Sequence, residues 1–135
     1  MKEKGGKNLK LSKDLSIPRQ GEIWLAELPK IKEFSKSFRP VLVISNNLQN
    51  EFDSLITIAT LTTDDVENVK PFEVFVSNTK ETGLDYPGKI LVGYSFTIYK
   101  ELRLIERLGV VSEETINKVK TALRISFDLG DIYNI

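Results

Sequence analysis

The side chains available for chemistry in this chain are basic and hydroxyl groups, because histidine and cysteine are both absent. Without histidine, the sequence lacks the residue that most often transfers protons near neutral pH and most often binds metals. Without cysteine, it has neither disulfides nor thiolate ligands, which fits a reducing compartment such as the cytoplasm. Glycine-rich phosphate loops, Ser/His/Asp series and metal-binding spacings are missing as well. We therefore expect no metal site and no cofactor.

Basic residues are concentrated in the first part of the chain. Through Arg39 there are 10 Lys and Arg against 5 Asp and Glu, whereas the remainder has 9 against 14. Lys30, Lys32 and Lys36 precede Arg39 on a polar segment, where they could contact phosphates without reading a base sequence. A solvated loop explains them equally well. The asymmetry is compatible with an anionic partner such as RNA.

The elements that must position these residues are mostly strands. The segment 40–44 is a continuous aliphatic run, typical of a strand buried on both faces, and Trp24 is typical of a packed core residue. The segment 29–38 is a long polar loop of the kind that often carries function, and 46–53 is turn-like and admits one helical turn. The predicted strands cover 22–28, 40–44, 55–61, 72–76, 90–92 and 96–99, and turns are predicted over 83–88.

One amphipathic helix is predicted near the end of the sequence. Ser112 is a suitable N-cap, acidic residues follow it in the first turn, and Gly130 is expected to stop the helix. The apolar stripe comprises Ile116, Val119 and Leu123. Short strands followed by a single helix predict a mainly β fold, in which a small barrel or strongly bent sheet packs against the helix.

The length of 135 residues corresponds to one domain. The first residues are rich in Lys, Gly and Ser without a sustained period, so we expect a flexible basic extension over 1–18 and a folded domain over 19–135. No apolar region follows the N-terminal lysines, and no stretch approaches the ~18 apolar residues that cross a bilayer. We therefore expect a cytoplasmic protein without a membrane segment.

A series of short segments identifies a family resemblance. The segments are Gly21–Trp24, Arg39–Asn46, Ala59–Thr62, Gly83–Leu84, Thr97–Lys100, Leu108–Gly109 and Ala122–Ser126. In this order they resemble the MazF/PemK family, the toxins of type II toxin-antitoxin systems, over residues 19–129. The resemblance implies an SH3-like small β-barrel with a C-terminal helix, related to MazF and CcdB, that forms a homodimer. It also implies metal-independent cleavage of single-stranded RNA to 2′,3′-cyclic phosphate and 5′-hydroxyl ends, and neutralisation by a cognate antitoxin.

The resemblance places the catalytic residues at Arg39 and Thr62. A planar guanidinium can hold two phosphate oxygens as negative charge gathers on them, and a threonine hydroxyl can orient a reacting oxygen. The proton acceptor stays open, because a guanidinium is normally never deprotonated. Without the resemblance, Arg39 could equally be a surface ion-pairing residue and Thr62 a structural one. The residues expected to bind RNA are Lys36, Ser37, Thr63 and Tyr94, with Phe96 as a further stacking candidate.

Two segments depart from the family pattern. Lys32–Ser37 replaces a Gly-Ser-Glu-like stretch in the first loop, and Tyr94–Phe96 replaces Gln-Ile-Arg, so the recognised RNA motif is expected to differ. A CcdB-like toxin that inhibits gyrase is one alternative, which would not need Arg39 or Thr62 and is disfavoured by the chain end Asp131–Ile135. A catalytically inactive regulatory relative is the other.

Overall fold

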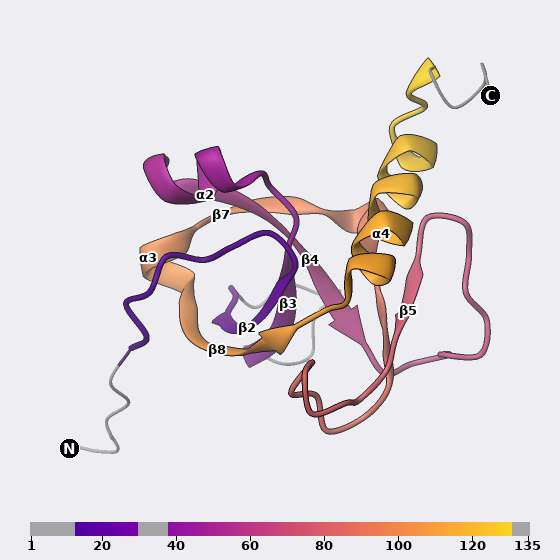
Figure 1. Ribbon diagram of the computed structural model, residues 1–135, viewed down its shortest axis with the longest axis horizontal. Helices are drawn as coiled ribbons and strands as arrows, with labels where there is room; N and C mark the ends of the chain where they lie inside the picture. Colours follow the sequence, from indigo (N-terminus) through magenta and orange to yellow (C-terminus); the bar gives the residue numbers. More distant parts are fainter. Residues whose placement is uncertain (1–12, 30–37, 131–135) are drawn as a thin grey trace.

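The structure is a computed structural model that describes residues 13–29 and 38–130. A curled sheet forms most of it, and the last helix packs along one side (Figure 1). The elements in chain order are β2 (Glu22–Glu27), β3 (Phe38–Val43), α2 (Asn47–Phe52), β4 (Leu55–Thr62), β5 (Val74–Val76), β6 (Gly88–Ile90), the 3-10 helix η1 (Val92–Tyr94), β7 (Phe96–Tyr99), α3 (Lys100–Arg103), β8 (Leu104–Val110) and α4 (Glu113–Ser126).

The strand β4 lies at the centre of the sheet, whose order is β5-β6-β4-β3-β2-β8 with all pairings antiparallel. The first half of β4 pairs with β7, its last two residues pair with β6, and β3 also pairs with it. The sheet curls into a half-barrel around these pairings (Figure 1). The prediction of a mainly β fold, in which a strongly bent sheet packs against a late helix, is confirmed.

Side chains from the two faces of the sheet form two buried clusters. Val41 and Val43 enter the cluster around Trp24, whereas Leu42 enters the cluster beneath α4. Because alternate residues of a strand point to opposite faces, β3 must be apolar at consecutive positions. Val41, Leu42 and Val43 are all 0% exposed and Trp24 is 1% exposed, so the predicted doubly buried strand and the packed tryptophan are confirmed.

The helix α4 covers one face of the sheet. Ser112 caps it, since its Oγ accepts a hydrogen bond of 3.1 Å from the Thr115 amide. Val119 and Ala122 are buried, and Ile116 and Leu123 pack partly buried beside them, so the predicted cap and apolar stripe are confirmed. The predicted stop at Gly130 is wrong. The helix ends at Ser126, and Asp128 turns the chain by adopting a left-handed φ of 55°.

Two predicted strands need correction, and the helical turn that the sequence admits over 46–53 is present. The strand expected over 90–92 comprises Gly88–Ile90 instead, because Val92–Tyr94 turns into η1. The strand expected over 72–76 begins only at Val74. The turn-like segment 46–53 forms the six-residue helix α2, which Asn46 caps by accepting a hydrogen bond of 2.8 Å from the Gln49 amide.

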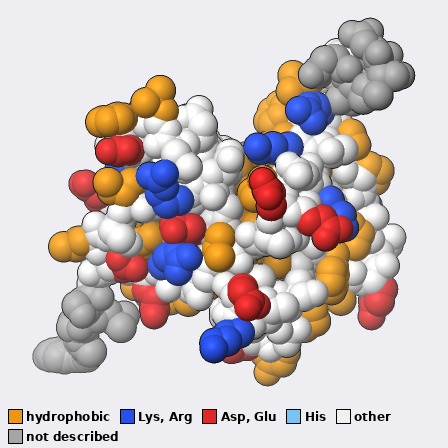
Figure 2. Space-filling view, viewed as in Figure 1, with side chains coloured by type: hydrophobic (Ala, Val, Ile, Leu, Met, Phe, Trp, Pro, Cys, Tyr) orange, Lys and Arg blue, Asp and Glu red, His pale blue; other side chains and the backbone are white. Residues whose placement is uncertain are grey.

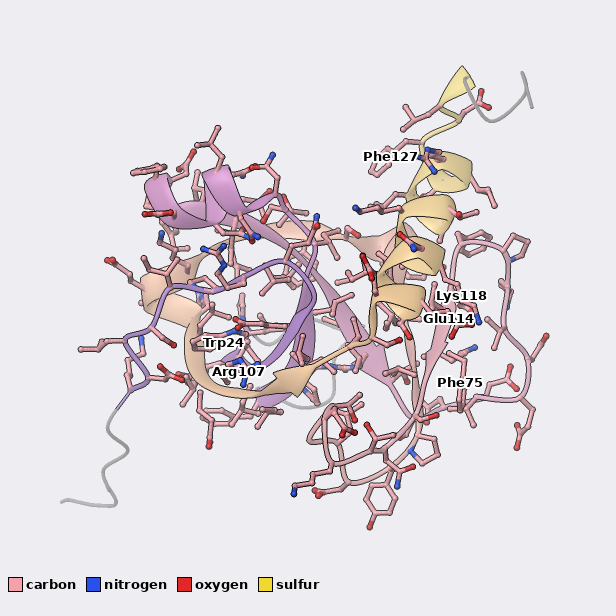
Figure 3. The ribbon with its side chains drawn as sticks, in the orientation of Figure 1. Trp24, Phe75, Arg107, Glu114, Lys118 and Phe127 are labelled. Atoms are coloured by element: carbon pink, nitrogen blue, oxygen red, sulfur yellow. The ribbon has the colours of Figure 1, made fainter. Side chains whose placement is uncertain are left out.

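The strand β8 was not predicted from the sequence. Its pairing with β2 shifts register twice, between Ile23 and Trp24 and between Leu25 and Ala26. Such irregularities break the period of two, so Glu106 and Arg107 are both exposed in the middle of the strand. Arg107 lies opposite Trp24 in this ladder, and the two side chains lie close together in Figure 3. Because these two adjacent residues are both charged, the segment does not alternate between apolar and polar residues, and the sequence did not predict a strand here.

The end of the expected N-terminal extension contacts the sheet. The Asp14 amide donates a hydrogen bond of 2.9 Å to the Ile105 carbonyl of β8, and the Asp14 carboxylate accepts one of 3.4 Å from the Arg107 amide. Residues 1–12 lie outside the described part of the chain. On the face shown in Figure 2, acidic and basic side chains are interspersed rather than gathered by sign.

Candidate functional site

A groove of about 390 Å³ opens at the end of β4 and contains both predicted catalytic residues. Arg39 comes from β3, and Thr62 is the last residue of β4. The residues that line the groove are Phe38, Arg39, Pro40, Leu61, Thr62, Thr63, Asp64, Leu84, Asp85, Tyr86 and Gly88. Strand ends and the loops that follow them therefore build this site.

The pairing of β3 with β4 explains why Arg39 and Thr62 meet. The strands are antiparallel, and Val41 lies opposite Thr60. Two residues further along, the same register places Arg39 opposite Thr62. Residues directly opposite each other on antiparallel strands project from the same face, so the pairing of these two strands brings a cation and a hydroxyl to one position.

The Arg39 guanidinium is half-buried and fixed to the neighbouring strand. Its Nη2 donates a hydrogen bond of 2.8 Å to the carbonyl of Leu61, the residue before Thr62. Burial lowers the pKa of Arg39 from its ordinary value, and the negative charge of Asp64 acts in the opposite direction. Because a guanidinium titrates far above neutrality, Arg39 supplies a permanent positive charge to the groove.

The Thr62 hydroxyl is held by its own loop. Its Oγ1 accepts a hydrogen bond of 3.1 Å from the Asp64 amide, which forms a local turn. A hydroxyl that accepts one hydrogen bond can still donate its proton to a ligand. The backbone of β6 also lies close, since a Cβ added at Gly88 would be 2.8 Å from the Thr62 carbonyl oxygen. Glycine at position 88 allows this close packing.

A buried ion pair between Lys89 and Glu73 lies beside Thr62, on the side of β6. Lys89 lies opposite Thr62 in the β4–β6 ladder, and its Nζ is 3.0 Å from Oε1 of Glu73, with side-chain exposures of 5% and 7%. The same ammonium donates a hydrogen bond of 3.0 Å to the Asn68 carbonyl. Burial alone would raise the pKa of Glu73, but hydrogen bonds from the Lys70 amide and Lys89, with the charges of both lysines, hold it below its ordinary value.

We expect Glu73→Gln to destabilise the protein by about 3 kcal/mol at neutral pH, because it leaves the buried Lys89 charge without its counter-ion. A carboxylate with a lowered folded-state pKa contributes stability above its unfolded pKa, and this contribution is lost as the pH falls through the folded pKa. The wild type should therefore lose more stability on acidification than Glu73→Gln does. Urea denaturation from neutral to acidic pH measures both effects.

Glu114→Gln is the matched control. Glu114 pairs with Lys118 one turn along α4, at 3.8 Å and with side chains 82% and 65% exposed, and both are labelled in Figure 3. An exposed pair of this kind contributes less than about 1 kcal/mol, so the control should unfold like the wild type. Equal stability of Glu73→Gln and the control would contradict the role given to the buried pair.

Of the residues predicted to bind RNA, Thr63 lies in the groove and Tyr94 does not. Thr63 is exposed and lines the groove beside Thr62. Tyr94 is 64% exposed but belongs to η1, which packs against α4 and β4, and it does not line the groove. Lys36 and Ser37 lie outside the described residues, as do Lys30 and Lys32.

Sequence reasoning missed several residues of the groove. Phe38, 48% exposed, and Tyr86, 71% exposed, present aromatic rings there, and Asp64 and Asp85 add carboxylates. The segment 83–88 was predicted only as turns. Turn residues indicate where a chain reverses but not which distant strand the turn packs against, so the proximity of Tyr86 to Thr62 had no sequence signal.

Within residues 13–29 and 38–130, no group of three or more acidic residues is placed to hold a metal ion. Over the same ranges, every helix is too short or too polar to span a bilayer. The ionisable and hydroxyl groups that line the groove include the Arg39 guanidinium, the hydroxyls of Thr62 and Thr63, and the carboxylates of Asp64 and Asp85.

Comparison with known proteins identifies the family. The model of the PemK-like, MazF-like toxin of type II toxin-antitoxin systems matches residues 19–127. The chain belongs to this toxin family. Among curated relatives of this PemK/MazF toxin, endoribonuclease EndoA of Bacillus subtilis is 31% identical over 116 residues, which cover 85% of this chain and 98% of EndoA. Endoribonuclease MazF of Staphylococcus epidermidis is 31% identical over 115 residues, covering 84% and 93% of the two chains.

Solved structures share the fold of this PemK/MazF toxin. An endoribonuclease in complex with its cognate antitoxin from Mycobacterial species superposes with a TM-score of 0.68 at 25% identity, covering 83% of this chain and 96% of that one. Crystalline MazF from Deinococcus radiodurans also has a TM-score of 0.68, at 22% identity, and covers 84% and 99% of the two chains.

Proposed function

We propose that this chain is a metal-independent endoribonuclease toxin that cleaves single-stranded RNA to 2′,3′-cyclic phosphate and 5′-hydroxyl ends. The observation that carries the proposal is that Arg39 and Thr62 line one groove of a MazF-like fold. The 31% identity to proteins named endoribonucleases supports the same activity.

The proposed chemistry is a transesterification at phosphorus. The ribose 2′-hydroxyl loses its proton to water as its oxygen attacks the adjacent phosphorus. The bond to the 5′-oxygen breaks, and the leaving oxygen takes up one proton from water to become the 5′-hydroxyl. Arg39 stabilises the negative charge that grows on the non-bridging oxygens, because its planar guanidinium matches two oxygens at once. Thr62 orients the attacking hydroxyl or a phosphate oxygen through its own hydroxyl.

Single-stranded RNA suits the rest of the groove. Unpaired bases can stack on aromatic rings, and Phe38 and Tyr86 provide exposed rings beside Arg39 and Thr62. Thr63 is close enough to the same groove to contribute a hydrogen bond. Lys36 and Ser37, which lie just before Phe38 in the sequence, complete the proposed RNA-binding set.

We infer that a cognate antitoxin neutralises this toxin and that two copies of the chain form the active homodimer in the cytoplasm. The Mycobacterial relative was solved with its cognate antitoxin, and MazF of Deinococcus radiodurans was solved with MazE. An acidic antitoxin segment that crosses the groove would compete with RNA phosphates for Arg39. Inhibition of cleavage by such a segment, but not by a neutralised copy of it, tests this inference.

Cleavage should proceed at an unchanged rate in excess EDTA, because the charge stabilisation assigned to Arg39 needs no divalent ion. The measurement compares initial rates on one RNA substrate before and after exhaustive chelation, at constant ionic strength. Constant ionic strength is needed because phosphate binding weakens with added salt. A strict requirement for magnesium would refute the proposed mechanism.

The gyrase-binding alternative does not use the pairing of Arg39 with Thr62, so the geometry of the groove favours the ribonuclease. A catalytically inactive relative would preserve the groove without turnover. The same chelation experiment separates these functions, because only the ribonuclease converts intact RNA into fragments.

A further inference from the structure

Pro40 occupies an unusual position for a proline. It lies on β3, an interior strand flanked by β2 and β4, and it pairs with Leu25 of β2. Proline has no backbone N–H and is ordinarily confined to edge strands, first residues or bulges. Its presence here removes one hydrogen bond from the sheet.

The ladder identifies the acceptor that loses its partner. The Ile44 amide donates a hydrogen bond of 3.0 Å to the Thr57 carbonyl, so even-numbered residues of β3 direct their amides toward β4. By the same register, Pro40 lies opposite Leu61. A backbone N–H at position 40 would therefore reach the Leu61 carbonyl.

The opposite edge of β4 supports this assignment. The Leu91 amide donates a hydrogen bond of 2.9 Å to the Thr60 carbonyl, so Thr60 directs its backbone groups toward β6. The backbone groups of successive residues point to alternate edges of a strand. Leu61 therefore directs its carbonyl toward β3 and Pro40.

The Arg39 side chain supplies the donor that Pro40 lacks. Its Nη2 donates to the Leu61 carbonyl oxygen at 2.8 Å, whereas a buried carbonyl without a donor would be costly. A side chain from the residue before proline thus completes the ladder. The same hydrogen bond anchors the guanidinium one residue from Thr62.

We infer that Pro40 is a positioning residue, which reserves the Leu61 carbonyl for Arg39 and thereby holds the guanidinium where the reacting phosphate binds. The inference rests on the proposed ribonuclease function. Pro40 has this effect because it has no backbone N–H that could donate to the Leu61 carbonyl. An alanine at this position would add a competing donor while keeping a small apolar side chain.

Pro40→Ala should lower kcat/KM for RNA cleavage by about tenfold, the effect expected from loss of one hydrogen bond to a charged group. Part of the decrease should appear as weaker substrate binding, because the displaced guanidinium no longer meets the phosphate in the bound RNA. Stability toward urea should be nearly unchanged, since the new backbone hydrogen bond to the Leu61 carbonyl replaces the one from Arg39. Protection of the new backbone amide at position 40 from hydrogen exchange reports directly that this bond has formed.

A double-mutant cycle separates positioning from a general effect on the fold. Binding is measured to an RNA oligonucleotide that carries 2′-deoxyribose at the cleaved position, for the wild type, Arg39→Ala, Pro40→Ala and the double variant. Pro40→Ala should weaken binding when Arg39 is present and leave it unchanged when position 39 is alanine. Equal effects in both backgrounds would overturn the inference.

The other outcomes are also decisive. A Pro40→Ala protein whose amide at position 40 is protected and whose kcat/KM equals that of the wild type would show that Arg39 does not need the Leu61 carbonyl. An unprotected amide at position 40 would show that the missing donor does not face Leu61. If instead the wild type cleaves no RNA, the proposed function fails, while amide protection still tests the hydrogen-bond geometry on its own.

Discussion

Replacing Arg39 with alanine should lower kcat for RNA cleavage by about 100- to 1000-fold, the loss seen when a donor to a developing oxyanion is removed. The variant should stay folded, because loss of the hydrogen bond from the guanidinium to the Leu61 carbonyl costs about 2 kcal/mol. Arg39→Lys should recover little activity, since an ammonium cannot hold two oxygens in the plane of a guanidinium. Single-turnover rates with saturating enzyme measure the chemical step.

The control for this experiment is Lys118→Ala. Lys118 lies on α4, and its side chain is 65% exposed, so its removal takes away one positive charge without touching the lining of the groove. The control should cleave at nearly the wild-type rate. A folded Arg39→Ala protein that cleaves as fast as the control would exclude Arg39 from catalysis.

Replacing Thr62 with valine should lower kcat by about 10- to 100-fold, because it removes the hydroxyl that positions a reacting oxygen and substitutes a side chain of similar volume. Thr62→Ser keeps the hydroxyl and should retain most of the rate. The valine variant also loses the hydrogen bond from the Asp64 amide, so a urea denaturation curve must accompany the kinetics.

Thr97→Val supplies the comparison, since Thr97 is an exposed strand residue of β7 outside the groove. It should leave both rate and stability unchanged. If Thr62→Val and Thr97→Val have the same kcat, the hydroxyl of Thr62 has no part in the reaction.

The sequence predicted those elements whose burial follows a simple period. β3 is apolar at every position from Val41 to Val43 because both faces of the sheet are covered, and α4 places its apolar residues at helical spacing. β8 was not predicted because its register shifts break the alternation of buried and exposed residues. The end of α4 was misplaced because Asp128, rather than a glycine, adopts the left-handed conformation.

The candidate site could be predicted only through the resemblance. Composition and motifs excluded histidine and cysteine chemistry, but nothing local to Arg39 or Thr62 distinguishes them from structural residues. Their meeting depends on the register of β3 against β4, and the contact with Tyr86 depends on how a distant turn folds. Contacts between residues that are distant in the sequence cannot be predicted from the residue pattern of either segment alone.

The most direct test of the account is to determine the end groups of RNA fragments produced by the purified full-length chain in EDTA. A long single-stranded RNA of known sequence is incubated with the wild type and with Arg39→Ala, and the cut positions and both termini are mapped. The account predicts cuts at discrete sites, with 2′,3′-cyclic phosphate and 5′-hydroxyl termini, that disappear with Arg39→Ala. Fragments with 5′-phosphate termini, or intact RNA after incubation with the folded wild type, would contradict it.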